Sequence, residues 1–278
     1  AINYCRNNKK GYTSSITTNG YLLSDQVYEL LKNVGVTYFQ ITIDGSKEDH
    51  DKRRCLIDGL PTYNKIIENI QNGLKKNFRI GVRINVDNDN VEGCCELIDD
   101  LAKLENIEDN LSLVICTVTP CENYTNIMFE RDIVSDIVKI YSCALDHEIT
   151  IGRFLSLSTP LDRFCVVDTS SQYIISPKGQ LFKCGEKFDE NDPGFVGQLR
   201  DDGSMEIKKW REIFWEKDPF EYKECIQCGV LPLCMGGCLL KRKVKGIPPC
   251  IPEFKYCNQE MLSLYSQYIL KEMERQKK

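Results

Sequence analysis

The sequence contains no apolar stretch long enough to form a transmembrane helix, and it carries no export signal. It also lacks an excess of positive charge, since 36 Lys and Arg residues stand against 41 Asp and Glu residues. The net charge of −5 argues against nucleic acid as a partner. Internal repeats are absent. These absences leave a cytoplasmic globular protein, and its 278 residues, 42% of them hydrophobic, suffice for a full core and predict two domains.

Cysteine is abundant, with 15 residues. Because there is no export signal, we expect thiolates in a reducing cytoplasm rather than a disulfide framework. One group of these cysteines is expected to be buried as small hydrophobic side chains: Cys5, Cys55, Cys94, Cys95, Cys116, Cys121 and Cys143.

A second group of cysteines lies toward the C-terminus, and four of its members are spaced C-x2-C-x5-C-x3-C. Sulfur ligands at this spacing suit zinc or an iron–sulfur cluster, and the spacing does not distinguish the two. Seven ligands exceed one tetrahedral site, whereas two cubane clusters need about eight. One iron would then be open to a further cysteine such as Cys250, to water or to a substrate. The seven predicted ligands are Cys165, Cys184, Cys225, Cys228, Cys234, Cys238 and Cys257.

The order Cys165, Gly179-x4-Cys184, the C-x2-C-x5-C-x3-C run and Cys257 resembles the seven-cysteine pattern of the SPASM domain. That family attaches the domain to radical S-adenosylmethionine (SAM) enzymes, many of which modify ribosomally made peptides. The resemblance implies two auxiliary [4Fe–4S] clusters. The first, open cluster would be held by Cys165, Cys184 and Cys238. The second would be held by Cys225, Cys228, Cys234 and Cys257.

In the first half of the chain, β-rich runs alternate with helical ones. Strands are predicted at residues 15–20, 38–45, 79–86 and 111–118. The intervening segments carry helical periodicity, and Ser24 and Thr62 are the predicted caps of the first two helices. Four successive βα units predict a parallel sheet with helices outside it.

Each predicted strand ends in polar residues, and ligands of parallel α/β sheets bind at the carboxyl ends of the strands. The runs ITTNGYLL, ITIDGSKEDHDKRR and RINVDNDN resemble the third, fourth and fifth strands of the partial (β/α)6 TIM-type barrel of radical SAM enzymes. Asp or Thr side chains can bind ribose hydroxyls, and Arg can bind the methionine carboxylate. The resemblance implies SAM contacts from Asn19, Thr42, Asp44, Arg54 and Asn85.

Further polar side chains near these strand ends need an interpretation. Arg53 and Arg83 are the alternatives to Arg54 as the carboxylate ligand. His50 is predicted to lie in a polar loop and His147 in a helix, and both are expected to be solvated or structurally satisfied rather than catalytic.

Two motifs of radical SAM enzymes are absent. One is the C-x3-C-x2-C loop that holds the SAM-binding cluster, and the other is a Gly-Gly-Glu motif. Because the first recognisable strand matches the family's third, we expect a barrel truncated before that strand, in a chain that begins within a helix. The resemblance implies SAM and a third [4Fe–4S] cluster in the full-length protein, and these residues alone are expected to be inactive.

The predicted fold class is therefore α/β with two domains. Residues 1–158 are expected to form the C-terminal part of the partial barrel, and residues 159–278 a small cysteine-rich α+β SPASM domain. Within the second domain, residues 173–184 predict a β-hairpin with Pro177 and Gly179 in its turn, and residues 259–278 predict a closing helix.

The functional hypothesis is an oxidoreductase that modifies a peptide or protein by hydrogen-atom abstraction. An open iron suits thioether formation in a Cys-containing substrate, and the chemistry requires an external electron donor. No nucleic-acid or membrane partner is expected. The competing hypothesis is a non-catalytic binding module whose tail, held together by zinc or iron–sulfur clusters, docks a peptide or protein partner.

Overall fold

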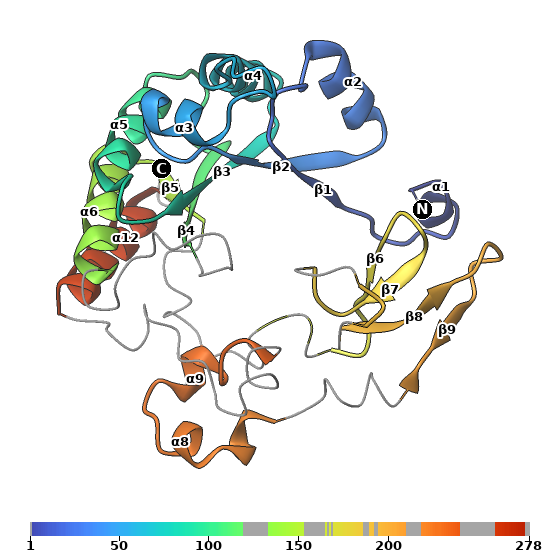
Figure 1. Cartoon of the computed structure of the whole chain (residues 1–278). Coiled ribbons are helices and arrows are strands. Elements are labelled where there is room, and N and C mark those ends of the chain that lie inside the picture. Colours follow the sequence, from blue (N-terminus) through green and yellow to red (C-terminus); the bar gives the residue numbers. More distant parts are fainter. Residues whose placement is uncertain are drawn as a thin grey trace. The chain divides into compact units, whose positions relative to one another are not determined.

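The computed structural model describes residues 2–118, 133–152, 165, 167, 169–185, 189–191, 194–209, 218–239 and 259–275. The described residues up to 152 form one compact unit together with 259–275, and those from 165 to 239 form a second unit (Figure 1). The predicted domain boundary at residues 158 and 159 lies outside the described residues and stays a prediction.

The first unit contains a parallel sheet of five strands in chain order. The predicted α/β fold with a parallel sheet is confirmed, with strand ends that shift by a few residues. Its strands are β1 (Ser14–Thr18), β2 (Val36–Thr42), β3 (Arg79–Val86), β4 (Leu111–Thr117) and β5 (Thr150–Ile151).

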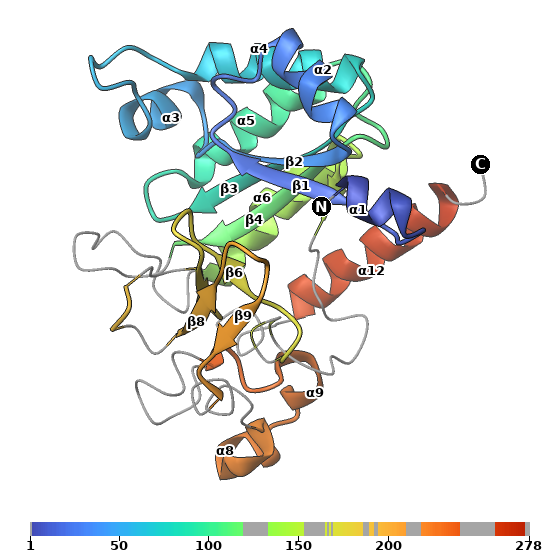
Figure 2. The ribbon, with the colours of Figure 1, turned by 90° about the vertical axis from the view of Figure 1, so that its right-hand side faces the viewer.

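The helices that lie between successive strands in the chain cover one side of the sheet (Figures 1 and 2). The closing helix packs against α6 of the same unit, where Lys271 Nζ donates to the Leu145 carbonyl at 2.6 Å. No described helix is long and apolar enough to cross a membrane. The helices are α1 (Ile2–Asn7), α2 (Asp25–Asn33), α3 (Lys47–Arg53), α4 (Tyr63–Lys75), α5 (Val91–Ala102), α6 (Ile133–Asp146) and α12 (Gln259–Arg275).

Both predicted caps stand at the N-cap position of a helix. Ser24 Oγ accepts the Val27 N–H at 3.4 Å at the start of α2. Thr62 precedes α4 as predicted, but its side chain makes no capping hydrogen bond. Asp51 takes its place, because its Oδ1 accepts the N–H groups of Thr62 and Tyr63 at 2.7 and 2.8 Å.

The two faces of the sheet differ in polarity because side chains alternate along each strand. On β3, the residues Ile80, Val82 and Ile84 are fully buried. Arg83 and Asn85 lie on the opposite face and are half-buried. The apolar face packs under the helices, and the polar face is left to line a site.

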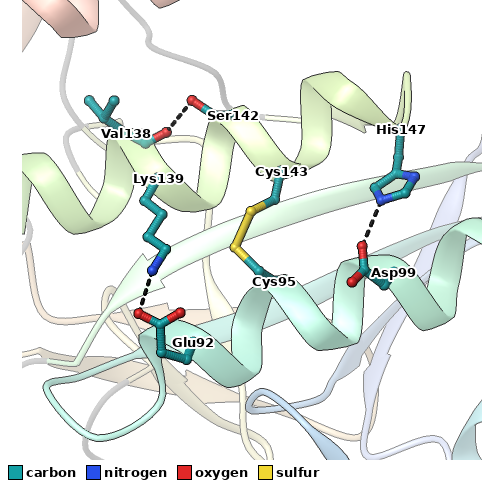
Figure 3. Close-up of a disulfide and its surroundings, with 8 residues drawn as sticks. All are labelled: Glu92, Cys95, Asp99, Val138, Lys139, Ser142, Cys143 and His147. Atoms are coloured by element: carbon teal, nitrogen blue, oxygen red, sulfur yellow. Dashed lines mark hydrogen bonds and ion pairs between the residues drawn. A yellow bond between two sulfur atoms is a disulfide. The ribbon is translucent and has the colours of Figure 1, made fainter.

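A disulfide joins Cys95 on α5 to Cys143 on α6 (Figure 3). It lies between two polar pairs that also join these helices, Glu92 with Lys139 and Asp99 with His147. The expectation that Cys95 and Cys143 are reduced, buried hydrophobes is therefore wrong. Of the other cysteines so predicted, Cys94 is buried and Cys55 is exposed.

The second unit contains an antiparallel sheet in the order β6-β7-β8-β9. The predicted hairpin is confirmed as β6 (Ile174–Ile175) and β7 (Gln180–Phe182), with Gly179 at φ +76° in the turn. The remaining elements are β8 (Phe195–Leu199), β9 (Met205–Ile207), the 3-10 helix η2 (Pro219–Glu221), α8 (Lys223–Ile226) and α9 (Leu231–Cys234).

Candidate functional site

A pocket of about 470 Å³ lies in the first unit at the carboxyl ends of β2, β3 and β4. This is the position at which parallel α/β sheets bind their ligands, and the volume falls within the range of small-molecule sites. Three arginines and one carboxylate give the pocket a strongly polar wall. The lining residues are Asp44, Arg53, Arg54, Arg83, Asn85, Thr117 and Val118.

Asp44 is the central residue of this wall. It follows β2, is almost fully buried, and uses both carboxylate oxygens. Oδ1 accepts from the backbone N–H and the side-chain amide of Asn85, at 3.2 and 2.9 Å. Oδ2 accepts from Arg54 Nε at 2.5 Å. The carboxylate is thus held in one orientation by groups from β3 and from the end of α3.

Two of the three pocket arginines are paired with carboxylates. Arg53 binds Asp87 through both terminal nitrogens, at 2.8 and 2.9 Å, and Arg54 binds Asp44. Arg83 donates its Nε to Asn85 Oδ1 at 2.9 Å and has no carboxylate partner among the described residues. The pocket wall therefore holds one guanidinium whose charge is not balanced by a described carboxylate, and such a group suits an anionic ligand group.

The structure brings together three of the five residues predicted to contact SAM, namely Asp44, Arg54 and Asn85. Thr42 ends β2 beside Arg83 in the sheet register but does not line the pocket. Asn19 is exposed, and its Oδ1 accepts the Tyr21 N–H at 3.2 Å, which is ordinary turn chemistry. Whether these residues contact SAM stays a prediction.

From the sequence, Arg83 is only an alternative to Arg54 as the carboxylate ligand, whereas the structure places it in the pocket wall. The signal was present, because Arg83 and Asn85 are two residues apart on one strand and so share a face. Arg53 was likewise only an alternative, and its bidentate partner Asp87 is distant in sequence.

His50 lies in α3 and not in a polar loop, so the predicted location was wrong. Its side chain is fully buried, and both ring nitrogens have partners at hydrogen-bonding distance. Burial lowers the pKa of His50, so the ring is neutral near pH 7. The prediction that His50 is structurally satisfied is consistent with these contacts. His147 follows α6, and its Nε2 lies 2.7 Å from Asp99 Oδ1.

The predicted metal ligands lie mostly in the second unit. Cys225 is on α8, Cys234 ends α9, and Cys228 and Cys238 follow those two helices. Among the described residues, no group of three or more His, Cys, Asp or Glu side chains is arranged to hold a metal ion. Cys250 and Cys257 lie outside the described residues, so the ligand assignment stays a prediction.

The backbone between Cys234 and Cys238 has a special conformation. Met235, Gly236 and Gly237 all have positive φ, at 46, 75 and 67°. Two successive glycines make such a run accessible. A set of thiolates around a glycine-rich turn has the donor chemistry of an iron–sulfur or zinc site.

No protein-family model matches the chain. Several solved structures share its fold. One is a histidine-tagged form of anSMEcpe with bound AdoMet, at 16% identity and a TM-score of 0.64, covering 99% of this chain and 74% of that one. Another is SuiB of Streptococcus suis bound to S-adenosylmethionine, at 15% identity and a TM-score of 0.55, covering 89% of this chain and 59% of that one. This likeness agrees with the α/β fold that the radical SAM resemblance implies.

Two curated proteins of Methanosarcina barkeri are similar in sequence. One is "Fe-coproporphyrin III synthase", 26% identical over 91 residues, which are 33% of this chain and 22% of that protein. The other is "AdoMet-dependent heme synthase", 25% identical in an alignment of length 248 that covers 80% of this chain and 68% of that protein. The chain thus spans less than a quarter of the first relative and about two thirds of the second.

Proposed function

We propose that this chain belongs to a radical SAM enzyme that binds SAM in the pocket of the first unit and modifies a peptide by hydrogen-atom abstraction. The observation that carries the proposal is the pocket itself. It gathers three of the predicted SAM contacts, Asp44, Arg54 and Asn85, around an arginine without a carboxylate partner among the described residues. The fold shared with SAM-bound proteins supports the same assignment.

The pocket residues suit different parts of SAM. The Asp44 carboxylate, held by Asn85 and Arg54, can accept hydrogen bonds from ribose hydroxyls. The methionine carboxylate needs a cation, and the sequence resemblance implies Arg54. Arg83 is the stronger candidate on charge, because Arg54 already neutralises Asp44. When bound beside a [4Fe–4S] cluster, SAM would supply the one-electron chemistry that removes a hydrogen atom from a substrate carbon.

For the second unit we propose a SPASM domain with two auxiliary [4Fe–4S] clusters on the predicted cysteines. The donor set fits, since every predicted ligand is a thiolate. A peptide substrate is supported by a neighbour of the same fold, "Native anSMEcpe with bound AdoMet and Kp18Cys peptide", with a TM-score of 0.61 and 16% identity, covering 96% of this chain and 75% of that one. For the present protein we propose a Cys-containing peptide and thioether formation.

The test is calorimetric binding of two nucleosides to the 278-residue chain. S-adenosylhomocysteine carries the amino-acid carboxylate, and 5′-methylthioadenosine lacks it. We expect Arg83→Gln to weaken binding of the first by about tenfold to a hundredfold and to leave the second unchanged. Arg79→Gln, an exposed arginine at the other end of β3, is the matched control. Wild-type chain that binds neither nucleoside would overturn the proposed function.

Arg54→Gln distinguishes the two carboxylate assignments. If Arg54 rather than Arg83 binds the methionine carboxylate, Arg54→Gln will abolish the preference for S-adenosylhomocysteine and Arg83→Gln will not. If Arg83 binds it, Arg54→Gln will weaken both nucleosides alike, because it leaves the Asp44 carboxylate without its cation.

The alternative function is a non-catalytic binding module whose tail holds zinc or iron–sulfur clusters. The cysteine spacing supports it, because this spacing suits zinc as well as iron–sulfur clusters. We propose that the 278 residues alone do not cleave SAM reductively. Release of 5′-deoxyadenosine by the reconstituted chain with dithionite would contradict this and would remove the alternative.

A further inference from the structure

His50 lies directly behind the pocket wall, on the short helix that joins two of its residues. Ser46 caps the start of α3, and its Oγ accepts the Asp49 N–H at 3.3 Å. One further turn along this helix, His50 points inward and is fully buried. Asp44 precedes the helix and Arg54 follows it, so His50 is held between two residues that line the pocket.

The hydrogen bonds of His50 are consistent with one protonation state. Its Nδ1 lies 3.3 Å from the Asp44 backbone nitrogen, which can only donate, so Nδ1 accepts. The hydroxyl of Thr62 donates to the Arg54 carbonyl at 2.6 Å. Because its single proton is used there, that hydroxyl accepts from His50 Nε2 at 3.1 Å. The ring is therefore the neutral Nε2–H tautomer.

This chain of bonds holds the backbone of both pocket residues. It runs from the Asp44 N–H through the imidazole and the Thr62 hydroxyl to the Arg54 carbonyl. The side chains of Asp44 and Arg54 then meet on the pocket side, with Nε and Oδ2 2.5 Å apart. Because the backbones of Asp44 and Arg54 are held in place, the position of their ion pair is also held.

The groups that face the ring agree with a neutral imidazole. Burial and the Arg54 cation oppose protonation, while the carboxylates of Asp44 and Asp51 favour it, and burial is the largest effect. The Tyr63 ring lies edge-on, with centroids 5.9 Å apart. If Nδ1 were protonated, its N–H would face the Asp44 N–H, and two donors cannot form a hydrogen bond with each other.

We propose that His50 is a positioning residue of the pocket: its neutral imidazole holds the backbones of Asp44 and Arg54 in the places from which their side chains bind the ligand. His50 is not among the residues that line the pocket. The identity of that ligand rests on the function proposed above, whereas the positioning rests on the hydrogen bonds.

The first arm of the test is the 15N spectrum of the imidazole rings in the full chain. The sequence contains two histidines, so His147→Gln leaves only the signals of His50. We expect the Nε2–H tautomer with an unprotonated Nδ1 at pH 7. An Nδ1–H tautomer or a protonated ring at this pH would overturn the proposal.

The second arm measures the binding of S-adenosylhomocysteine by calorimetry. His50→Ala is expected to lose at least about tenfold in affinity, since it leaves the buried Asp44 N–H unpaired. His50→Asn places a carbonyl oxygen at the position of Nδ1 and is expected to remain within about threefold of wild type. His50→Gln can reach Thr62 but not the Asp44 N–H, and should resemble His50→Ala. His147→Gln is the matched control, because His147 pairs with Asp99 away from the pocket lining.

The outcomes separate the two proposals. A folded His50→Ala chain with wild-type affinity would overturn the positioning role. If His50→Ala does not fold, the Asn and Gln variants decide, and equal affinities for those two would also overturn it. If wild-type chain shows the Nε2–H tautomer but binds no nucleoside, the proposed function fails while the anchoring by His50 stands.

Discussion

Arg53 and Asp87 form a bidentate ion pair whose carboxylate is fully buried, with N–O distances of 2.8 and 2.9 Å. The pair links the end of α3 to the loop after β3 and so fixes one wall of the pocket. We expect Arg53→Ala to lower the free energy of unfolding by about 3–5 kcal/mol, because it removes a cation and two hydrogen bonds from a fully buried carboxylate.

Urea denaturation checks this expectation. Lys65→Ala, which removes an exposed ion pair with Glu68 on α4, is the matched control and should change the free energy by at most about 1 kcal/mol. Equal effects of the two substitutions would mean that the Arg53–Asp87 pair contributes no more than a surface pair.

The parallel sheet could be predicted from sequence because its strands carry a simple signal. In β3, the buried Ile80, Val82 and Ile84 alternate with half-buried or small residues, and such a pattern fits one buried face. The polar strand ends pointed to the correct edge of the sheet. They could not show that the Asn19 side chain accepts the Tyr21 N–H within a turn, because that contact depends on the local backbone conformation.

α3 was not predicted because its sequence KEDHDKR has no apolar periodicity. Its stability comes from its ends instead. Ser46 caps the first turn, Glu48 and Asp49 lie near the positive end of the helix dipole, and Lys52 and Arg53 lie near the negative end. The burial of His50 depends on tertiary contacts with Thr62 and Tyr63, which sequence spacing does not reveal.

The Cys95–Cys143 disulfide closes a loop across α5 and α6, at a sequence separation of 48. Sequence could not pair these two cysteines, because pairing depends on how the two helices align. We expect Cys95→Ser to lower the free energy of unfolding by about 2–4 kcal/mol, and a reducing agent to lower that of wild type by the same amount.

Peptide mapping without reductant should recover the cross-linked Cys95 and Cys143 peptides. Cys55→Ser removes an exposed thiol and serves as the control, with no change expected. Wild-type chain whose two thiols react fully with an alkylating agent would show that the bond does not form in solution.

His50 makes stability depend on pH in a defined direction. Burial lowers its pKa in the folded chain below the ordinary value of 6.5. On acidification the unfolded chain therefore takes up this proton before the folded chain does, and the folded state is disfavoured. The His50 contribution is constant above about pH 6.5 and falls as the pH drops below it.

The measurement is the difference in unfolding free energy between wild type and His50→Asn from about pH 8 to about pH 5. Carboxylates titrate in both chains and cancel. We expect the difference to be flat above about pH 6.5 and to shift against wild type below it. A flat difference over the whole range would show that His50 is not buried as a neutral ring.

The seven predicted ligand cysteines are expected to bind iron. Seven thiolates and one open iron fit two auxiliary clusters, so anaerobic reconstitution should yield about eight irons and eight sulfides per chain. Cys228→Ala should lose one cluster. It should also lower the melting temperature of the reconstituted chain, because metal binding in small cysteine-rich domains supplies folding free energy.

Cys55→Ala is the matched control, since Cys55 lies in the first unit and outside the predicted ligand set. Iron analysis and the optical spectrum of the reconstituted chain should be unchanged in this variant. The thiolate spacing suits zinc as well as iron. A stoichiometric zinc content that iron and sulfide cannot replace would therefore overturn the cluster assignment. It would favour the non-catalytic binding module whose tail holds zinc.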